Sequence, residues 1–259
     1  MKLRNVPASQ GLQWVKSGVW TFFRQPLALS GLFFIFMALM SVLSMIPVLG
    51  SALALAVLPG ATLGLLAASE EASKGKFPMP TILLSAFRAE RKTLRPMLIL
   101  GAYYAAGFLL VMGATAVVDG GQLAKMYLLG GKIADETLKS EEFKWAAVTA
   151  MTLYIPLSLL FWHAPALVYW HKVSPAKSLF FSFMACQRHF WAYTVYATAW
   201  MVISILMGVV IATVALATGN AELVANLVFP CVLLMAAMFF SSIYFTFVGS
   251  FDLSPDETP

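Results

Sequence analysis

The stretch PALVYWHKVSPAKSLFFSFMACQRHFW, residues 165–191, decides how the rest of the chain is interpreted. Its first six residues end a long apolar run, and a short basic link follows at His171–Pro175. Residues 176–189 then predict a helix on the membrane surface that leads into another apolar run. Weaker copies of this order occur elsewhere, so we interpret the chain as membrane helices alternating with surface helices.

The composition supports a membrane protein. The chain has 259 residues, of which 60% are hydrophobic and 11% are charged. Soluble domains carry about 25% charged residues, more than twice as many. A soluble core of this size cannot hide so much apolar surface, so the lipid bilayer must solvate it. We therefore predict an all-α polytopic membrane protein.

Six apolar segments are long enough to cross about 30 Å of hydrocarbon. Together they predict a single transmembrane domain over residues 1–251, built as three helical hairpins, with a loop on the outer side at 119–144. Residues 252–259 are acidic and contain proline, which favours a disordered tail. The expected spans are residues 26–46, 47–68, 96–118, 145–170, 192–218 and 225–251.

We expect an amphipathic surface helix on the cytoplasmic side before each hairpin. Residues 11–25 place apolar side chains on one face, and Trp14 and Trp20 are suited to the membrane interface. Residues 81–95 separate basic from apolar side chains in the same way, and residues 176–189 provide the third helix.

The distribution of basic residues predicts the orientation. All of the 17 Lys and Arg residues except Lys125, Lys132, Lys139 and Lys144 lie in segments that the six spans put on one side. The positive-inside rule places that side in the cytoplasm. Both termini are then cytoplasmic, and the 119–144 loop lies outside.

The three surface segments also suggest an internal repeat. Ser85 and Arg91 have the same spacing as Ser182 and Arg188, and Gly18 and Arg24 repeat it near the N-terminus. Every unit begins on the same side, so the repeat would be parallel, with its axis along the membrane normal.

Two kinds of candidate site follow. Arg and Lys on the surface segments can hold lipid phosphates, although a solvated face that only sets the topology is the simpler explanation. His163 is an ionisable residue well inside a span, where it serves either in hydrogen-bonded packing or as a ligand or pH-sensitive group. The headgroup candidates are Arg24, Arg88, Arg91, Lys92, Arg95, Lys177 and Arg188.

No motif indicates catalysis or a cofactor. The sequence lacks HExxH, GxSxG and a phosphate loop, and the spacing of Cys186 with His171 and His189 matches no zinc pattern. We therefore expect no catalytic residue, no cofactor, no metal and no nucleic acid. The expected partners are membrane lipids, including anionic ones, and the sequence does not identify a protein partner.

Two stretches carry a resemblance to known proteins. GVWTFFRQP before the first span, and APALVYW with SPAKSLFFSFMACQRHFWAY between the fourth and fifth, resemble a family of six-helix inner-membrane proteins of proteobacteria. A fainter similarity exists to the membrane domain of some glycerophosphodiester phosphodiesterases. The resemblance implies an inner-membrane location, and it carries over no catalytic residue because the soluble phosphodiesterase domain has no counterpart here.

Three functions are compatible with these patterns. The first is a non-enzymatic membrane component that acts through lipid contact or a protein partner. The alternative is a passive or lipid-like small-molecule transporter with a pathway between the repeats, lined by the proline-bearing spans and His163. The third is a membrane enzyme whose site gathers residues from several loops.

Overall fold

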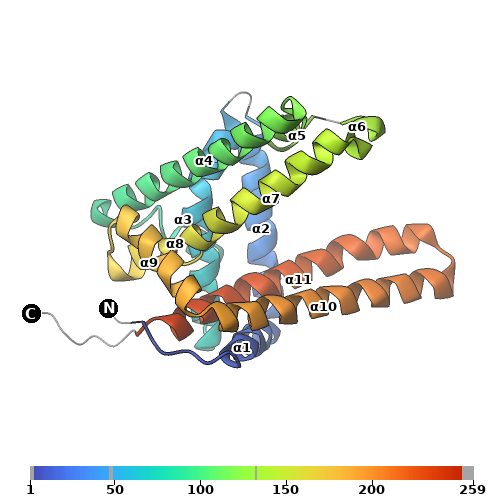
Figure 1. Cartoon of the computed structure of the whole chain (residues 1–259). Coiled ribbons are helices and arrows are strands. Elements are labelled where there is room, and N and C mark those ends of the chain that lie inside the picture. The colour runs from blue at the N-terminus through green and yellow to red at the C-terminus, as the bar shows by residue number, and fades with distance from the viewer. Residues whose placement is uncertain (1–2, 47–48, 132, 253–259) are drawn as a thin grey trace, which may run out of the picture. The chain divides into compact units, whose positions relative to one another are not determined.

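The computed structural model describes residues 3–46, 49–131 and 133–252 (Figure 1). Within these residues the regular secondary structure is helical, apart from one isolated bridge between Leu3 and Phe251. The elements are α1 (Gln10–Arg24), α2 (Pro26–Ser44), α3 (Gly50–Ser73), the 3-10 helix η1 (Pro80–Leu84), α4 (Arg91–Asp119), α5 (Gln122–Leu129), α6 (Asp135–Lys139), α7 (Glu141–Phe161), α8 (Ala164–His171), α9 (Pro175–Arg188), α10 (Phe190–Thr218) and α11 (Ala221–Ser250).

The all-α fold with six membrane-spanning segments is confirmed. Six helical segments of the described chain are long and apolar enough to cross a bilayer. Their bounds are Pro26–Ser44, Gly50–Ser73, Arg91–Asp119, Glu141–His171, Phe190–Thr218 and Glu222–Ser250. The acidic tail expected at 252–259 falls outside the described residues except for Asp252.

The predicted surface helix at residues 81–95 is wrong. Within residues 81–90 only those that belong to η1 are helical. Residues 91–95 form the beginning of α4. An isolated helix of this length is marginal, so packing decides its conformation. Leu83 packs its backbone against Gly64, and the Phe87 ring lies over Gly60. The irregular segment therefore packs directly on the two glycines of α3.

The fourth span is broken, where one continuous helix was expected. α7 ends at Phe161, and α8 begins at Ala164. Pro165 in the first turn of α8 has no N–H to donate to the carbonyl of Phe161, so the helical ladder is interrupted there.

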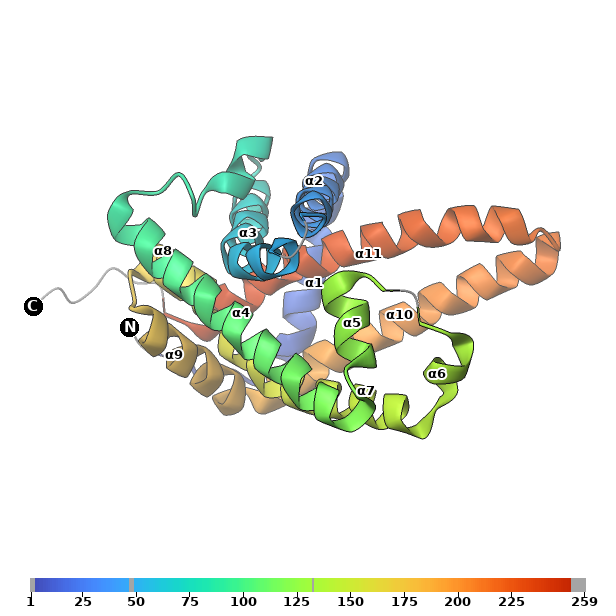
Figure 2. The same ribbon diagram turned by 90° about the horizontal axis from the view of Figure 1, so that it is seen from above.

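The chain divides into two compact units, and unit 2 contains residues 38–62 and 86–184. In it α4 packs along α7, and α5 lies against both, as Figure 2 shows. α8 packs on α4 as well. Close approach depends on small residues: a Cβ on Gly101 of α4 would strike the backbone oxygen of Ala56 in α3.

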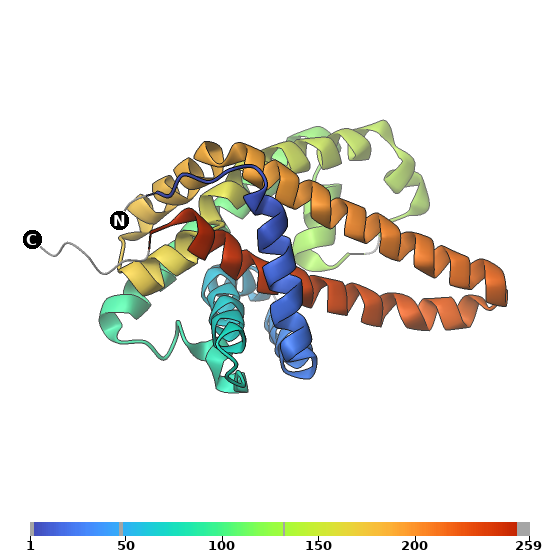
Figure 3. The same ribbon diagram turned by 90° about the horizontal axis from the view of Figure 1, so that it is seen from below.

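Unit 1 contains residues 3–37, 63–85 and 185–252 of the described chain. Its α10 and α11 pack against each other, and α1 lies across them, as the blue helix in Figure 3 shows. Trp14 of α1 is only 2% exposed and packs against Tyr193 and Gly249. Its predicted interfacial position is therefore wrong, because α10 and α11 cover that face. Trp20 is 65% exposed and stays available to an interface.

The first and third surface segments are helical in the structure, as α1 and α9. Their position on a membrane surface, the grouping into three equivalent hairpins and the internal repeat stay predictions. The 119–144 loop contains α5 and α6 in addition to the beginning of α7.

Candidate functional site: a basic face and an apolar groove

Four exposed basic residues gather where α4 begins. Arg88 precedes the helix, Arg91 and Lys92 open it, and Arg95 follows one turn later. Among the described residues, none of the four forms an ion pair with a carboxylate. A helix N-terminus carries partial positive charge, so cations there cost about 0.3–1 kcal/mol of helix stability. Helix stability therefore does not explain their placement.

Tertiary structure adds Lys172 to this cluster. Its Nζ donates a hydrogen bond of 2.8 Å to Thr93 Oγ1 in the first turn of α4. The same Nζ lies 5.2 Å from the centre of the Tyr169 ring. Lys172 closes α8 in the left-handed conformation, with φ of 55°, a position where glycine is usual. Sequence analysis missed Lys172 because the contact joins residues 79 positions apart.

The remaining headgroup candidates have different surroundings. Lys177 is exposed on α9 in unit 2, whereas Arg24 and Arg188 belong to unit 1. Arg24 Nη1 donates to the carbonyl of Ser73 at 3.0 Å, and its guanidinium lies 5.7 Å from the centre of the Trp20 ring. Arg24 thus caps the C-terminus of α3, which leaves its other N–H donors for further contacts.

His163 lies at the break between α7 and α8 and is fully buried. Ser182 of α9 fills the break: the His163 N–H donates to Ser182 Oγ at 2.9 Å, and Ser182 Oγ donates to the Leu159 carbonyl at 2.7 Å. In an unbroken α-helix that N–H would bond directly to that carbonyl. The inserted hydroxyl therefore satisfies both groups and supports a packing role for the His163 backbone.

An apolar groove of about 470 Å³ lies among α4, α5 and α7 in unit 2. Its polar side chains are Tyr127 and Tyr154, and the Tyr154 hydroxyl lies 3.2 Å from that of Tyr104. The other lining residues are Phe108, Val111, Met112, Leu123, Ala147, Ala150 and Met151.

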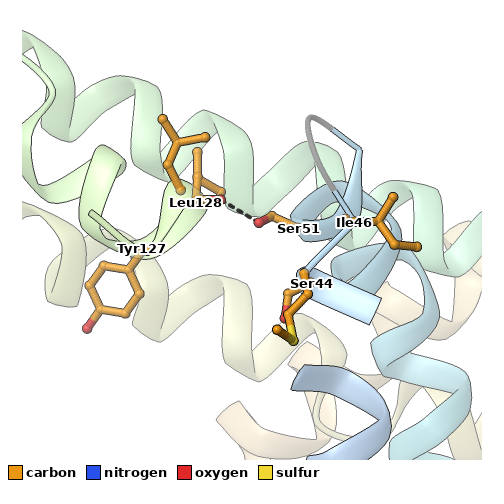
Figure 4. A pocket seen from close by; sticks show the side chains of 9 residues that line it. Ser44, Ile46, Ser51, Tyr127 and Leu128 are labelled. Atoms are coloured by element: carbon orange, nitrogen blue, oxygen red, sulfur yellow. Dashed lines mark hydrogen bonds between the residues drawn. The ribbon is translucent and has the colours of Figure 1, made fainter. Parts of the chain in front are cut away.

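A second hollow of about 530 Å³ adjoins the groove at Tyr127, which lines both (Figure 4). It lies between the end of α2, the beginning of α3 and the end of α5, and it is more polar. Ser51 donates a hydrogen bond across it to the carbonyl of Leu128. The further lining residues are Ser44, Met45, Ile46, Gly50, Leu129 and Gly130.

In unit 1 the segment around Arg4 contacts the end of α11 and the residues that follow it. The Arg4 N–H donates to the Ser250 carbonyl at 3.1 Å, and Arg4 lies 3.7 Å from the Asp252 carboxylate. The Arg4 carbonyl also lies 2.8 Å from His189 Nε2. Burial lowers the pKa of His189, the bond to the Arg4 carbonyl raises it, and the charge of Arg188 lowers it further.

Neither the thiol of Cys186 nor the described His, Cys, Asp and Glu side chains indicate a reactive or metal-binding site. Burial raises the pKa of Cys186 to about 12, and a hydrogen bond with Tyr193 opposes the shift. The thiol therefore stays protonated at neutral pH, which makes it a poor nucleophile. Within the described part of the chain, no three His, Cys, Asp or Glu residues lie close enough together to hold a metal ion.

The chain is similar over its full length to a known protein. The chain is 36% identical over 262 residues to a probable inner membrane protein of Burkholderia thailandensis, and the match covers 100% of this chain and 97% of the relative. No protein-family model matches the chain. No solved structure matches it either.

Proposed function

The chain belongs to the family of the probable inner membrane protein of Burkholderia thailandensis, and on this premise we propose that it acts by binding the headgroups of anionic lipids. It is a multi-pass protein of the inner membrane.

The observation that carries the proposal is the basic face at the beginning of α4. Arg88, Arg91, Lys92 and Arg95 are exposed, and among the described residues they have no acidic partner. Each Lys or Arg near an anionic membrane surface contributes about 1 kcal/mol of attraction. Arginine can also hold a phosphate through two parallel hydrogen bonds. Lipid phosphate is therefore a partner that would offset the charge that the fold leaves uncompensated.

We propose that this face lies on the cytoplasmic leaflet, with both termini on the same side. The bridge between Leu3 and Phe251 supports a common side for the termini. The excess of Lys and Arg in segments before the odd-numbered spans supports the cytoplasm as that side.

Replacing the four basic residues tests the proposal. We expect Arg88→Gln, Arg91→Gln, Lys92→Gln and Arg95→Gln together to lower the preference for phosphatidylglycerol over phosphatidylcholine at least about tenfold, because four attractive charges are lost. The measurement is electron spin resonance of spin-labelled lipids in the reconstituted membrane.

The matched control removes the same charge from the other predicted side. Lys125→Gln, Lys132→Gln, Lys139→Gln and Lys144→Gln should leave that preference nearly unchanged. Equal effects of the two sets, or no effect of the first, would contradict the proposal.

The transport alternative remains a prediction. The groove among α4, α5 and α7 offers it an apolar space in unit 2, but neither His163 nor a proline is among the residues that line this groove. It requires a path across the membrane in addition to a binding site. Flux of a lipid-like dye across vesicles that contain the protein would support it.

A further inference from the structure

We infer that the groove among α4, α5 and α7 binds one hydrocarbon chain of a membrane lipid. The inference goes beyond headgroup binding: it depends on the membrane location of the protein and not on the basic face.

The groove exists because α7 contributes small side chains where α4 contributes large ones. Ala147 and Ala150 face a wall that includes Phe108 and Met112. Elsewhere along the same pair of helices the packing is close, since a Cβ on Gly107 would lie 2.6 Å from Leu157 Cδ1. A space of about 470 Å³ thus remains between helices that otherwise touch.

The lining suits hydrocarbon better than a polar ligand. Apart from two tyrosines, every side chain that lines the groove is apolar. The Tyr154 hydroxyl has the Tyr104 hydroxyl beside it at 3.2 Å. Water gains few hydrogen bonds in such a space, and an apolar occupant loses none by entering it.

The opening of the groove points to lipid as the source of that hydrocarbon. Met151 lines the groove and is 72% exposed on α7. Its neighbours Val148 and Ile155 are exposed apolar residues of the same span. In a bilayer these side chains contact acyl chains, so the groove is continuous with the lipid-facing surface. A helix of a partner protein, about 10–12 Å across, would fill this volume with little more than one turn.

The adjoining hollow indicates how a lipid would be oriented in the groove. Tyr127 lines both spaces, and the hollow beyond it contains serine hydroxyls and backbone carbonyls (Figure 4). A lipid with its chain in the groove can therefore place its polar part beside Tyr127 and Ser51. Tyrosine is suited to this position because its ring is apolar and its hydroxyl can form hydrogen bonds with polar groups.

Photo-crosslinking tests the inference on the full chain in a bilayer. The probe is a phosphatidylcholine with a diazirine at the end of one acyl chain, so that its headgroup has no net charge. Met112 lines the groove but is only 4% exposed, whereas Val148 is 50% exposed outside it. We expect adducts on Met112 at a yield comparable with Val148. Labelling of Val148 with none on Met112 would overturn the inference.

A filled groove provides the second measurement. Ala150→Trp should lower Met112 labelling about tenfold, which corresponds to ~1.4 kcal/mol. Val148→Trp places the same side chain outside the groove and should leave the labelling unchanged. If Ala150→Trp lacks wild-type helicity by circular dichroism, Ala147→Leu replaces it. Unchanged labelling in a folded filled variant would overturn the inference.

The basic face provides the separation from headgroup binding. The fourfold Gln variant of Arg88, Arg91, Lys92 and Arg95 should keep full Met112 labelling by this neutral probe. Loss of the phosphatidylglycerol preference with retained Met112 labelling supports both ideas independently, and failure of either measurement refutes only the idea it tests.

Discussion

At the scale of single residues, Ser182 has the clearest structural role in the chain. Its hydroxyl accepts from His163 and donates to Leu159, two backbone groups of a broken membrane helix. Water is absent from the hydrocarbon, so unpaired backbone groups there are costly. One side chain from α9 thereby makes a break in the fourth span tolerable.

Removing that hydroxyl should destabilise the protein. We expect Ser182→Ala to lower the free energy of unfolding by about 1–3 kcal/mol, because a buried N–H and a buried C=O lose their partner. Thermal unfolding in detergent, followed by circular dichroism, measures the change.

The matched control is Ser178→Ala in the same helix. Ser178 is also buried, but its hydroxyl donates only to the carbonyl of Pro175 within its own turn. It should cost clearly less than Ser182→Ala. Equal losses for the two variants would show that burial, not the bridged helix break, sets the cost.

At the scale of elements, the beginning of α10 is joined to the N-terminal segment through His189. The ring bonds the Arg4 carbonyl, and Asp252, Arg4 and Arg188 are the charged groups around this contact. Because burial lowers the pKa of His189 in the folded protein, the unfolded chain binds its proton at a higher pH. The neutral ring therefore stabilises the folded state above the ordinary pKa of 6.5, and this contribution is lost as the pH falls below it.

Acidification should accordingly loosen the N-terminal segment. We expect amide hydrogen exchange at Arg4, whose N–H bonds Ser250, to become faster relative to its intrinsic rate as the pH falls from 8 to about 5. His189→Gln keeps a hydrogen-bond donor but cannot titrate, so it should flatten this pH dependence. A wild-type profile that matches the variant would exclude His189 as the titrating group.

Element boundaries show the limit of periodicity. Residues 81–95 have the pattern of an amphipathic helix, yet Leu83 and Phe87 dock on Gly64 and Gly60 in irregular and 3-10 conformations. The sequence predicts the apolar face of α1, but it places Trp14 at the membrane interface, whereas the structure packs Trp14 against Tyr193 of α10 and Gly249 of α11. Both errors arise because periodicity shows that a face is apolar, and not what covers it.

At the scale of the whole molecule, the sequence predicts six crossings with both termini inside. A reporter fused after Pro259 should be active in the cytoplasm, because the segments rich in Lys and Arg remain on that side. A cysteine introduced at Thr137 should react with an impermeant maleimide from outside in intact cells. The control, a cysteine at Lys92, should react only after the membrane is opened; the reverse pattern would contradict the orientation.

The sequence by itself determined the all-helical fold, the six apolar segments and the membrane location. These features depend on the length and composition of contiguous runs, which the thickness of the bilayer sets and which local sequence records directly. It also marked Arg88, Arg91, Lys92 and Arg95 as one basic face, since they lie close together in the chain.

Only the tertiary structure decided the features that join distant residues. Lys172 reaches Thr93 across 79 positions, Ser182 fills the break at His163, and the groove opens where Ala147 and Ala150 meet α4 and α5. A hydrogen bond or a cavity depends on which surfaces meet and how closely they pack. That information is absent from any single segment of the chain, because packing energy belongs to pairs of surfaces and not to either one alone.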